Sequence, residues 1–177
     1  MDALSGIVQQ ILDLISAHIF AGVFAAALTE TILPVIPSLV IFPLAGYLAS
    51  EAGMGLPSVI LLGVVGGAGA TAGSVVPFVI AWKLGRLALK RYLRFARISD
   101  DKLVRAEGWF ERHGNKAVFF GRLVPAVREL ISIPAGLLHM NLYRFLIYTF
   151  LGSCIWCLVL VVSGYYLGPE VFNRLLQ

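Results

Sequence analysis

Two long stretches of the chain contain no charged residue. Residues 52–82 and 145–169 lack Asp, Glu, Lys and Arg altogether. A membrane-spanning helix needs about 20 consecutive apolar residues, so each stretch predicts one transmembrane helix. The first stretch also carries the spacings Gly63-xxx-Gly67 and Gly69-xxx-Gly73. Small residues four apart let a second helix approach closely, which predicts a tightly packed helix here.

Two further apolar regions are interrupted by charges and prolines. The interruptions of residues 14–49 are Glu30, Pro34, Pro37 and Pro43, and those of residues 117–140 are Arg122, Pro125, Arg128, Glu129 and Pro134. Proline removes a backbone donor and breaks the helical hydrogen-bond ladder. Each region therefore predicts two short helices joined by a break, the pattern of a re-entrant hairpin. Such a break is tolerated at membrane depth only against protein or a watery cavity.

The two interrupted regions repeat. A shift of 91 residues places Pro34 on Pro125 and Pro43 on Pro134. A hairpin plus a helix over about residues 18–83 is thus followed by a hairpin plus a helix over about residues 112–175. Because each copy contains one span, the second copy is inverted relative to the first. Inverted repeats with paired broken helices indicate a transporter whose site lies at the breaks.

Composition places the chain in a membrane. Hydrophobic residues make up 59% and charged residues 14%, against about 45–50% and about 25% in soluble domains. The fold class predicted is therefore an all-α integral membrane protein, in which residues 1–177 form a single membrane domain of two inverted repeats. Residues 4–16 predict a short interfacial helix, and no cleavable signal peptide is expected.

Positive charge gathers between the two repeats. Residues 83–116 hold ten of the fourteen basic residues and four acids, a net charge of +6. Short basic loops stay on the cytoplasmic side, so residues 84–111 predict amphipathic helices on the cytoplasmic face. Ser99 is expected to begin the second of these helices and Gly114 to end it. A basic block between spans favours anionic lipid as its partner and excludes nucleic acid.

Ionisable groups within the apolar regions are the candidate site. Each costs roughly 2.5–3.5 kcal/mol at the centre of a membrane, so each needs a reason. The two guanidinium groups of Arg122 and Arg128 suit a phosphate, and the Glu30 carboxylate suits a proton. The same three groups also suit plain structural pairing. Residues six apart point about 240° apart on a continuous helix, so the arginines converge only if Pro125 unwinds the chain.

The remaining polar residues are weaker candidates for the site. Glu129 is expected to pair with Arg122, and Glu51 to be a solvated residue at a hairpin mouth. The three histidines are too scattered in the sequence for a metal site. Ser38 and Ser132 lack a partner histidine, which argues against nucleophilic catalysis. We therefore expect no enzyme, no metal and no cofactor, and we expect the thiols of Cys154 and Cys157 to pack as small apolar groups.

Several motifs together resemble one family. They are Thr29-Glu30, Pro37-Ser38-xxxx-Pro43, Phe119-Phe120-Gly121-Arg122-xx-Pro125-xx-Arg128 and Gly152-xxx-Trp156. Over about residues 18–168 the chain resembles the DedA family, the bacterial branch of the VTT-domain, or SNARE-associated, membrane proteins. The resemblance implies two opposed re-entrant hairpins and lipid transport linked to the proton-motive force. Family members are implicated in moving undecaprenyl phosphate across the plasma membrane, and eukaryotic relatives resemble phospholipid scramblases.

The resemblance also assigns roles. Glu30 matches the family's acid of the first hairpin, and Arg122 and Arg128 match its two essential arginines. The implied partners are a lipid phosphate, membrane lipids and protons in a bacterial plasma membrane, and a homo-oligomer is compatible with the pattern. Leu39 stands where the family usually has a second acid. Glu129 or Glu51 would have to replace that acid, so proton-coupled transport and energy-independent scrambling both stay open.

Overall fold

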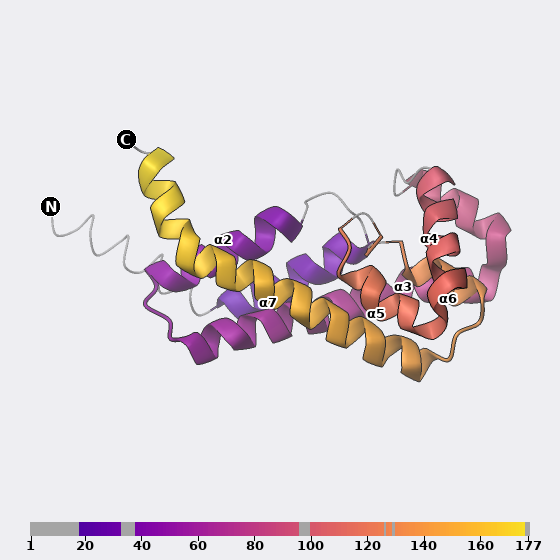
Figure 1. The fold of residues 1–177 in the computed structure, drawn as a ribbon, viewed down its shortest axis with the longest axis horizontal. Coiled ribbons are helices and arrows are strands. Elements are labelled where there is room, and N and C mark those ends of the chain that lie inside the picture. The colour runs from indigo at the N-terminus through magenta and orange to yellow at the C-terminus, as the bar shows by residue number, and fades with distance from the viewer. Residues whose placement is uncertain (1–17, 33–37, 96–99, 126, 129, 176–177) are drawn as a thin grey trace, which may run out of the picture.

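The computed structural model describes residues 18–32, 38–95, 100–125, 127–128 and 130–175. Within these ranges every regular element is a helix, which confirms the all-α class. The molecule is elongated, and its last helix runs along most of its length (Figure 1). The predicted helix over residues 4–16 and the predicted cap at Ser99 lie outside the described residues.

Two helices are long and apolar enough to cross a membrane, as the charge-free stretches predicted. They are α3 (Leu56–Phe95) and α7 (Leu142–Leu175), with apolar spans of 28 residues at Leu56–Lys83 and 27 residues at Leu142–Gly168. At 1.5 Å per residue each span is about 40 Å long, more than the roughly 30 Å of bilayer hydrocarbon. Large apolar side chains along both, among them Leu61 and Val159, are exposed. An apolar exposed surface of this kind suits contact with lipid.

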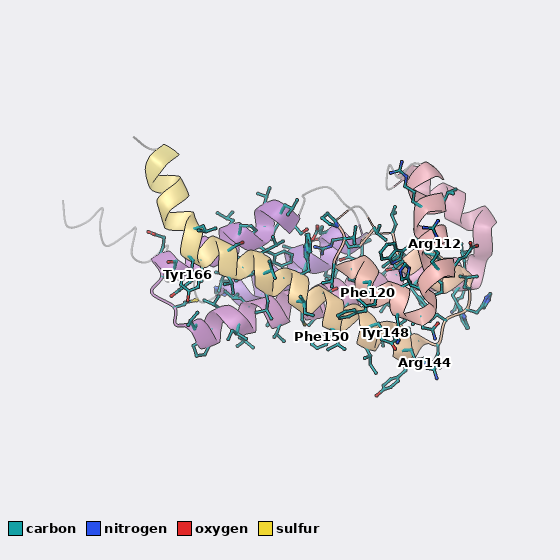
Figure 2. All side chains as sticks on the ribbon, in the orientation of Figure 1. Arg112, Phe120, Arg144, Tyr148, Phe150 and Tyr166 are labelled. Atoms are coloured by element: carbon teal, nitrogen blue, oxygen red, sulfur yellow. The ribbon has the colours of Figure 1, made fainter. Side chains whose placement is uncertain are left out.

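The basic connector leaves the first span at Gly85. This glycine adopts φ 61° and ψ −163° inside α3, a left-handed conformation that glycine adopts without steric penalty. Helix α4 (Asp100–His113) follows, and Gly114 ends it with φ 55°, as predicted. Arg112 of α4 and Arg144 of α7 lie at the same end of the molecule, and Tyr166 lies at the other (Figure 2).

The small residues of α3 are helix contacts, as their spacing predicted. Gly67 lies against Cys154 of α7, with the Cys154 Cα 2.9 Å from where a Cβ would stand. Gly73 lies against the backbone of Leu28, which belongs to the helix His18–Ile32. The two glycine pairs thus place α3 between α7 and the helix His18–Ile32.

The first interrupted region contains two helices. They are His18–Ile32 and α2 (Ser38–Glu51); Pro34 and Pro37 between them lie outside the described residues. Pro43 interrupts the hydrogen-bond ladder without ending the helix, because it lies inside α2. Its missing N–H removes one ladder bond only, a loss that packing against a neighbouring helix makes tolerable. The Pro43 carbonyl lies directly against Gly164 of α7, which supplies that packing.

The second interrupted region is much shorter. Helix α5 (Ala117–Arg122) and helix α6 (Ser132–Leu137) have six residues each, against 14 in α2. Pro125 lies in the non-helical segment between them. The prediction of a break at Pro134 is wrong, because Pro134 is the third residue of α6. The first turn of a helix has no intrahelical partner for its N–H groups, so proline costs little there.

The interior consists of two separate apolar clusters. One joins His18–Ile32 and α2 to α3 and the second half of α7, and it includes Phe42 and Val161. The other joins α3, α4, α5, α6 and the first half of α7 and includes Phe78 and Phe145. Along the chain, buried Glu30 lies between Ala27 and Phe42 of the first cluster, and buried Arg122 and Arg128 lie between Val118 and Ile131 of the second.

Candidate functional site

Three charged side chains are almost completely removed from solvent. Glu30, Arg122 and Arg128 are exposed by only 4%, 1% and 3%. Glu30 lies in the last turn of His18–Ile32, Arg122 is the last residue of α5, and Arg128 lies in the break before α6. A buried charge is costly unless it is paired and hydrogen-bonded. The contacts of these three groups therefore define the site.

The Glu30 carboxylate joins the two interrupted regions. Its Oε1 accepts a hydrogen bond of 2.7 Å from the backbone N–H of Ser38, the first residue of α2. A carboxylate is favoured there because helix N-termini carry unpaired N–H groups and positive partial charge. Its Oε2 lies 3.9 Å from Nη2 of Arg128 and makes no hydrogen bond among the described residues. One carboxylate oxygen is thus fixed, and the other is held only by a loose ion pair.

Arg128 lies between three groups from three segments. Its Nη1 donates a hydrogen bond of 3.0 Å to Oγ of Ser38, and its Nη2 faces Glu30. The guanidinium lies over the ring of Trp156, with Cζ 5.1 Å from the ring centroid. A cation over an indole face is attracted by the ring quadrupole. The guanidinium is thereby held in one orientation at the meeting point of α2, the α5–α6 break and α7.

Arg122 binds the non-helical segment between α5 and α6. Its Nη1 donates 2.8 Å to the carbonyl oxygen of Arg128, and its Nη2 donates 2.7 Å to Oγ of Ser132. Its stem lies against Gly152 of α7, where a Cβ would stand 2.7 Å from the Arg122 Cβ. The fork therefore fixes the backbone of Arg128 and the first residue of α6. The unwinding around Pro125 brings the arginines together, but their guanidinium groups bind different partners.

The other predicted site residues lie elsewhere. Glu51 is exposed at the last residue of α2, thirteen residues and about 20 Å of helix from Ser38. Glu129 lies outside the described residues. Leu39 is 54% exposed, so the position at which a second acid was considered faces away from the interior. No group of three His, Cys, Asp or Glu within the described ranges could hold a metal ion.

Two serines of the site were missed as ligands by the sequence reasoning. Ser38 and Ser132 were weighed only as nucleophiles, yet each accepts a hydrogen bond from a buried arginine. Both are the first residues of their helices. The available signal was the serine beside a proline-rich break, since serine is favoured where a helix begins.

An apolar groove opens between the two helices of the first interrupted region. It has a volume of about 470 Å³ and lies between His18–Ile32 and α2, with Val23, Val40, Leu44 and Leu48 among its walls. Val40 and Leu44 are 55% and 43% exposed. Apolar, accessible side chains of this kind suit a hydrocarbon chain.

Comparison with known proteins identifies one domain family. The VTT domain matches residues 36–166. Undecaprenyl phosphate transporter A of Bacillus subtilis is 30% identical over 167 residues, 94% of this chain and 81% of that protein. The "Alkaline phosphatase-like protein" of Lactococcus lactis is 36% identical over 160 residues, which cover 85% and 72% of the two chains.

Protein DedA of Escherichia coli is 35% identical over 69 residues, 38% of this chain and 32% of that protein. No solved structure matches the chain. The VTT domain covers most of the chain, and two relatives at 30% identity or more are matched over most of their length. The chain therefore belongs to the VTT-domain family of membrane proteins, the DedA family.

Proposed function

We propose that this protein transports a lipid phosphate, undecaprenyl phosphate or a close relative, across the bacterial plasma membrane. The observation that carries the proposal is the buried guanidinium of Arg128, held between Glu30, Ser38 and Trp156. Arginine is suited to phosphate because its planar fork donates two parallel hydrogen bonds to anionic oxygens. A relative matched over 94% of this chain is named an undecaprenyl phosphate transporter, which supports the same substrate.

Exchange at Arg128 gives the proposal a mechanism. The Glu30 oxygen that faces Arg128 is 3.9 Å away and makes no hydrogen bond with any residue that the structure describes. A phosphate oxygen about 2.8 Å from the guanidinium nitrogens of Arg128 would bind Arg128 more strongly than this carboxylate does. Once displaced, the Glu30 carboxylate would lose its positively charged partner, and a proton would be the simplest replacement for that charge. Phosphate binding at Arg128 and proton binding at Glu30 would then occur together, which would couple transport to protons.

Arg122 serves this exchange in a different way. Both of its terminal nitrogens donate to the break, one to the Arg128 carbonyl and one to Ser132. It therefore positions the backbone that carries Arg128 and adds a second positive charge to the site. A phosphate bound at Arg128 would be attracted by both guanidinium groups.

The same proposal gives a role to the elements around the site. The apolar groove between His18–Ile32 and α2 would hold the hydrocarbon tail while the headgroup is bound at Arg128. The two broken regions would be opposed re-entrant hairpins of an inverted repeat, and the basic connector would face the cytoplasm. Tyr166 toward one end of α7 and Arg144 at the other (Figure 2) suit a span that crosses from one surface to the other.

Energy-independent scrambling of phospholipids is the second candidate. It is favoured by Leu39, which is apolar and 54% exposed where a second acid would otherwise supply a titratable group. Scrambling needs a groove for headgroups but no proton exchange, so the two functions differ in selectivity and in their response to a pH gradient.

Reconstitution in vesicles separates these functions. Proteoliposomes would be loaded with labelled undecaprenyl phosphate or with labelled phosphatidylcholine, and translocation measured with and without a pH gradient. We expect the phosphate lipid to move at a rate that changes with the gradient, and phosphatidylcholine to move no faster than in protein-free vesicles. Equal rates for both lipids, unchanged by the gradient, would instead establish the scramblase.

A further inference from the structure

A row of buried polar groups follows one face of α7 beside the site. Ser153 and Trp156 lie four and seven residues after Thr149, so the three side chains share a face of the helix. Thr149 and Ser153 are 0% and 1% exposed, and Trp156 is half-buried. The Oγ1 of Thr149, the Oγ of Ser153 and the Nε1 of Trp156 make no hydrogen bond within the part of the chain that the structure describes.

Other hydroxyl groups in the apolar helices behave differently. Five of them donate to a backbone carbonyl three or four residues earlier: Thr29, Thr31, Thr71, Ser74 and Ser163. This local bond is the usual way for a membrane helix to satisfy a hydroxyl. Thr149 and Ser153 do not make this hydrogen bond although both are buried. A buried polar group without a partner is costly, so these two hydroxyls are open to a partner that the described residues do not supply.

One end of this row lies beside Arg122 and Arg128. Trp156 lies beneath the guanidinium of Arg128, and Gly152, within the row's own turn of helix, contacts Arg122. From Trp156 to Thr149 the row extends about 10 Å along α7. It runs toward the first turn of α7, which lies at the same end of the molecule as α4 (Figure 1). Along α7 it occupies the interval between Phe145 of one apolar cluster and Cys157 of the other.

We propose that Thr149, Ser153 and Trp156 form a binding track for the phosphate headgroup between Arg128 and the α4 end of the protein. The inference rests on the proposed function and adds the route that the headgroup takes. A phosphate carries several acceptor oxygens, and two hydroxyls and an indole N–H are donors placed in sequence along its path. The Arg128 end binds most strongly because it adds charge, and the two hydroxyls bind more weakly, which lets the headgroup leave.

The test removes the donors and keeps the shapes. The variants are Thr149→Val, Ser153→Ala, their double variant, and Trp156→Phe, which keeps a ring beneath Arg128. We expect the double variant to transport undecaprenyl phosphate at least about tenfold more slowly, the smallest loss expected when hydrogen bonds to a charged group are removed. The ratio of rates with and without a pH gradient should stay unchanged. Thr149→Ser and Ser153→Thr, which keep a hydroxyl, should retain transport. Ser163→Ala on the same helix is the matched control, because its hydroxyl already bonds to the Leu160 carbonyl.

Stability separates this role from a structural one. Replacing an unpaired buried hydroxyl by an apolar group of the same shape should leave the melting temperature of the double variant equal to or above that of the wild type. Transport by the double variant at the wild-type rate would overturn the track. So would a loss confined to the response to the pH gradient, because that loss is expected if the hydroxyls hold water molecules that carry protons to Glu30. A wild-type protein that moves no phosphate lipid at all would instead overturn the proposed function.

Discussion

Arg128→Lys is expected to lower the rate of phosphate-lipid transport by at least about tenfold while the protein still accumulates in the membrane. Lysine keeps the positive charge, so Glu30 retains a counter-ion. It cannot reproduce the fork that donates to Ser38 and faces Glu30 at once, nor the planar group that lies over Trp156. Losing one hydrogen bond to a charged group costs about 1.5–3 kcal/mol, roughly tenfold to 100-fold. The measurement is the initial rate in proteoliposomes at matched protein density.

The matched control is Arg144→Lys. Arg144 is exposed in the first turn of α7, so the same chemical change there should leave transport as it was. If Arg128→Lys transports as fast as Arg144→Lys, Arg128 supplies only charge, and recognition of phosphate by the guanidinium fork is ruled out.

Glu30→Gln is expected to abolish the response of transport to a pH gradient, with the ratio of the two rates falling to about one. Glutamine keeps the shape and still accepts the hydrogen bond from the Ser38 N–H, but it cannot exchange a proton. It also leaves Arg128 without its counter-ion, and an unpaired buried charge costs about 3–5 kcal/mol. A phosphate should therefore stabilise this variant more strongly than it stabilises the wild type, while turnover slows because nothing displaces the bound headgroup.

Glu51→Gln is the control for this experiment. Glu51 is an exposed acid at the far end of α2, so its loss should leave the ratio unchanged. Two measurements are needed: transport with and without the gradient, and the rise in melting temperature on adding the phosphate lipid. A Glu30→Gln variant that keeps the wild-type ratio would remove Glu30 from proton coupling and leave it a structural partner of Arg128.

The parts of the fold that the sequence predicted are those set by local composition. The spans of α3 and α7 follow from charge-free runs long enough to cross a bilayer, and Gly85 and Gly114 show why the connector separates from them. Proline position alone was a weaker guide. Pro43 continues α2 and Pro134 begins α6, because the effect of a proline depends on which carbonyl it faces and how far into the helix it lies.

The site was predicted as a set of charges and not as a set of contacts. Burial cost singled out Glu30, Arg122 and Arg128, and the spacing of the arginines required an unwound segment, which lies between α5 and α6. The division of labour between the arginines depends on the path of the break, which turns the Arg128 carbonyl toward Arg122. Ser38 and Arg128 are 90 residues apart, so only the packed fold reveals that they meet.

The central claim is that a phosphate headgroup binds at Arg128, and a binding measurement tests it most directly. Purified protein in detergent would be titrated with undecaprenyl phosphate and with undecaprenol, which has the same hydrocarbon chain and no phosphate. We expect the phosphate to bind at least about tenfold more tightly than the alcohol, a difference of about 1.4 kcal/mol, and Arg128→Lys to remove most of that advantage. Equal affinities of the wild-type protein for the two lipids would contradict the account.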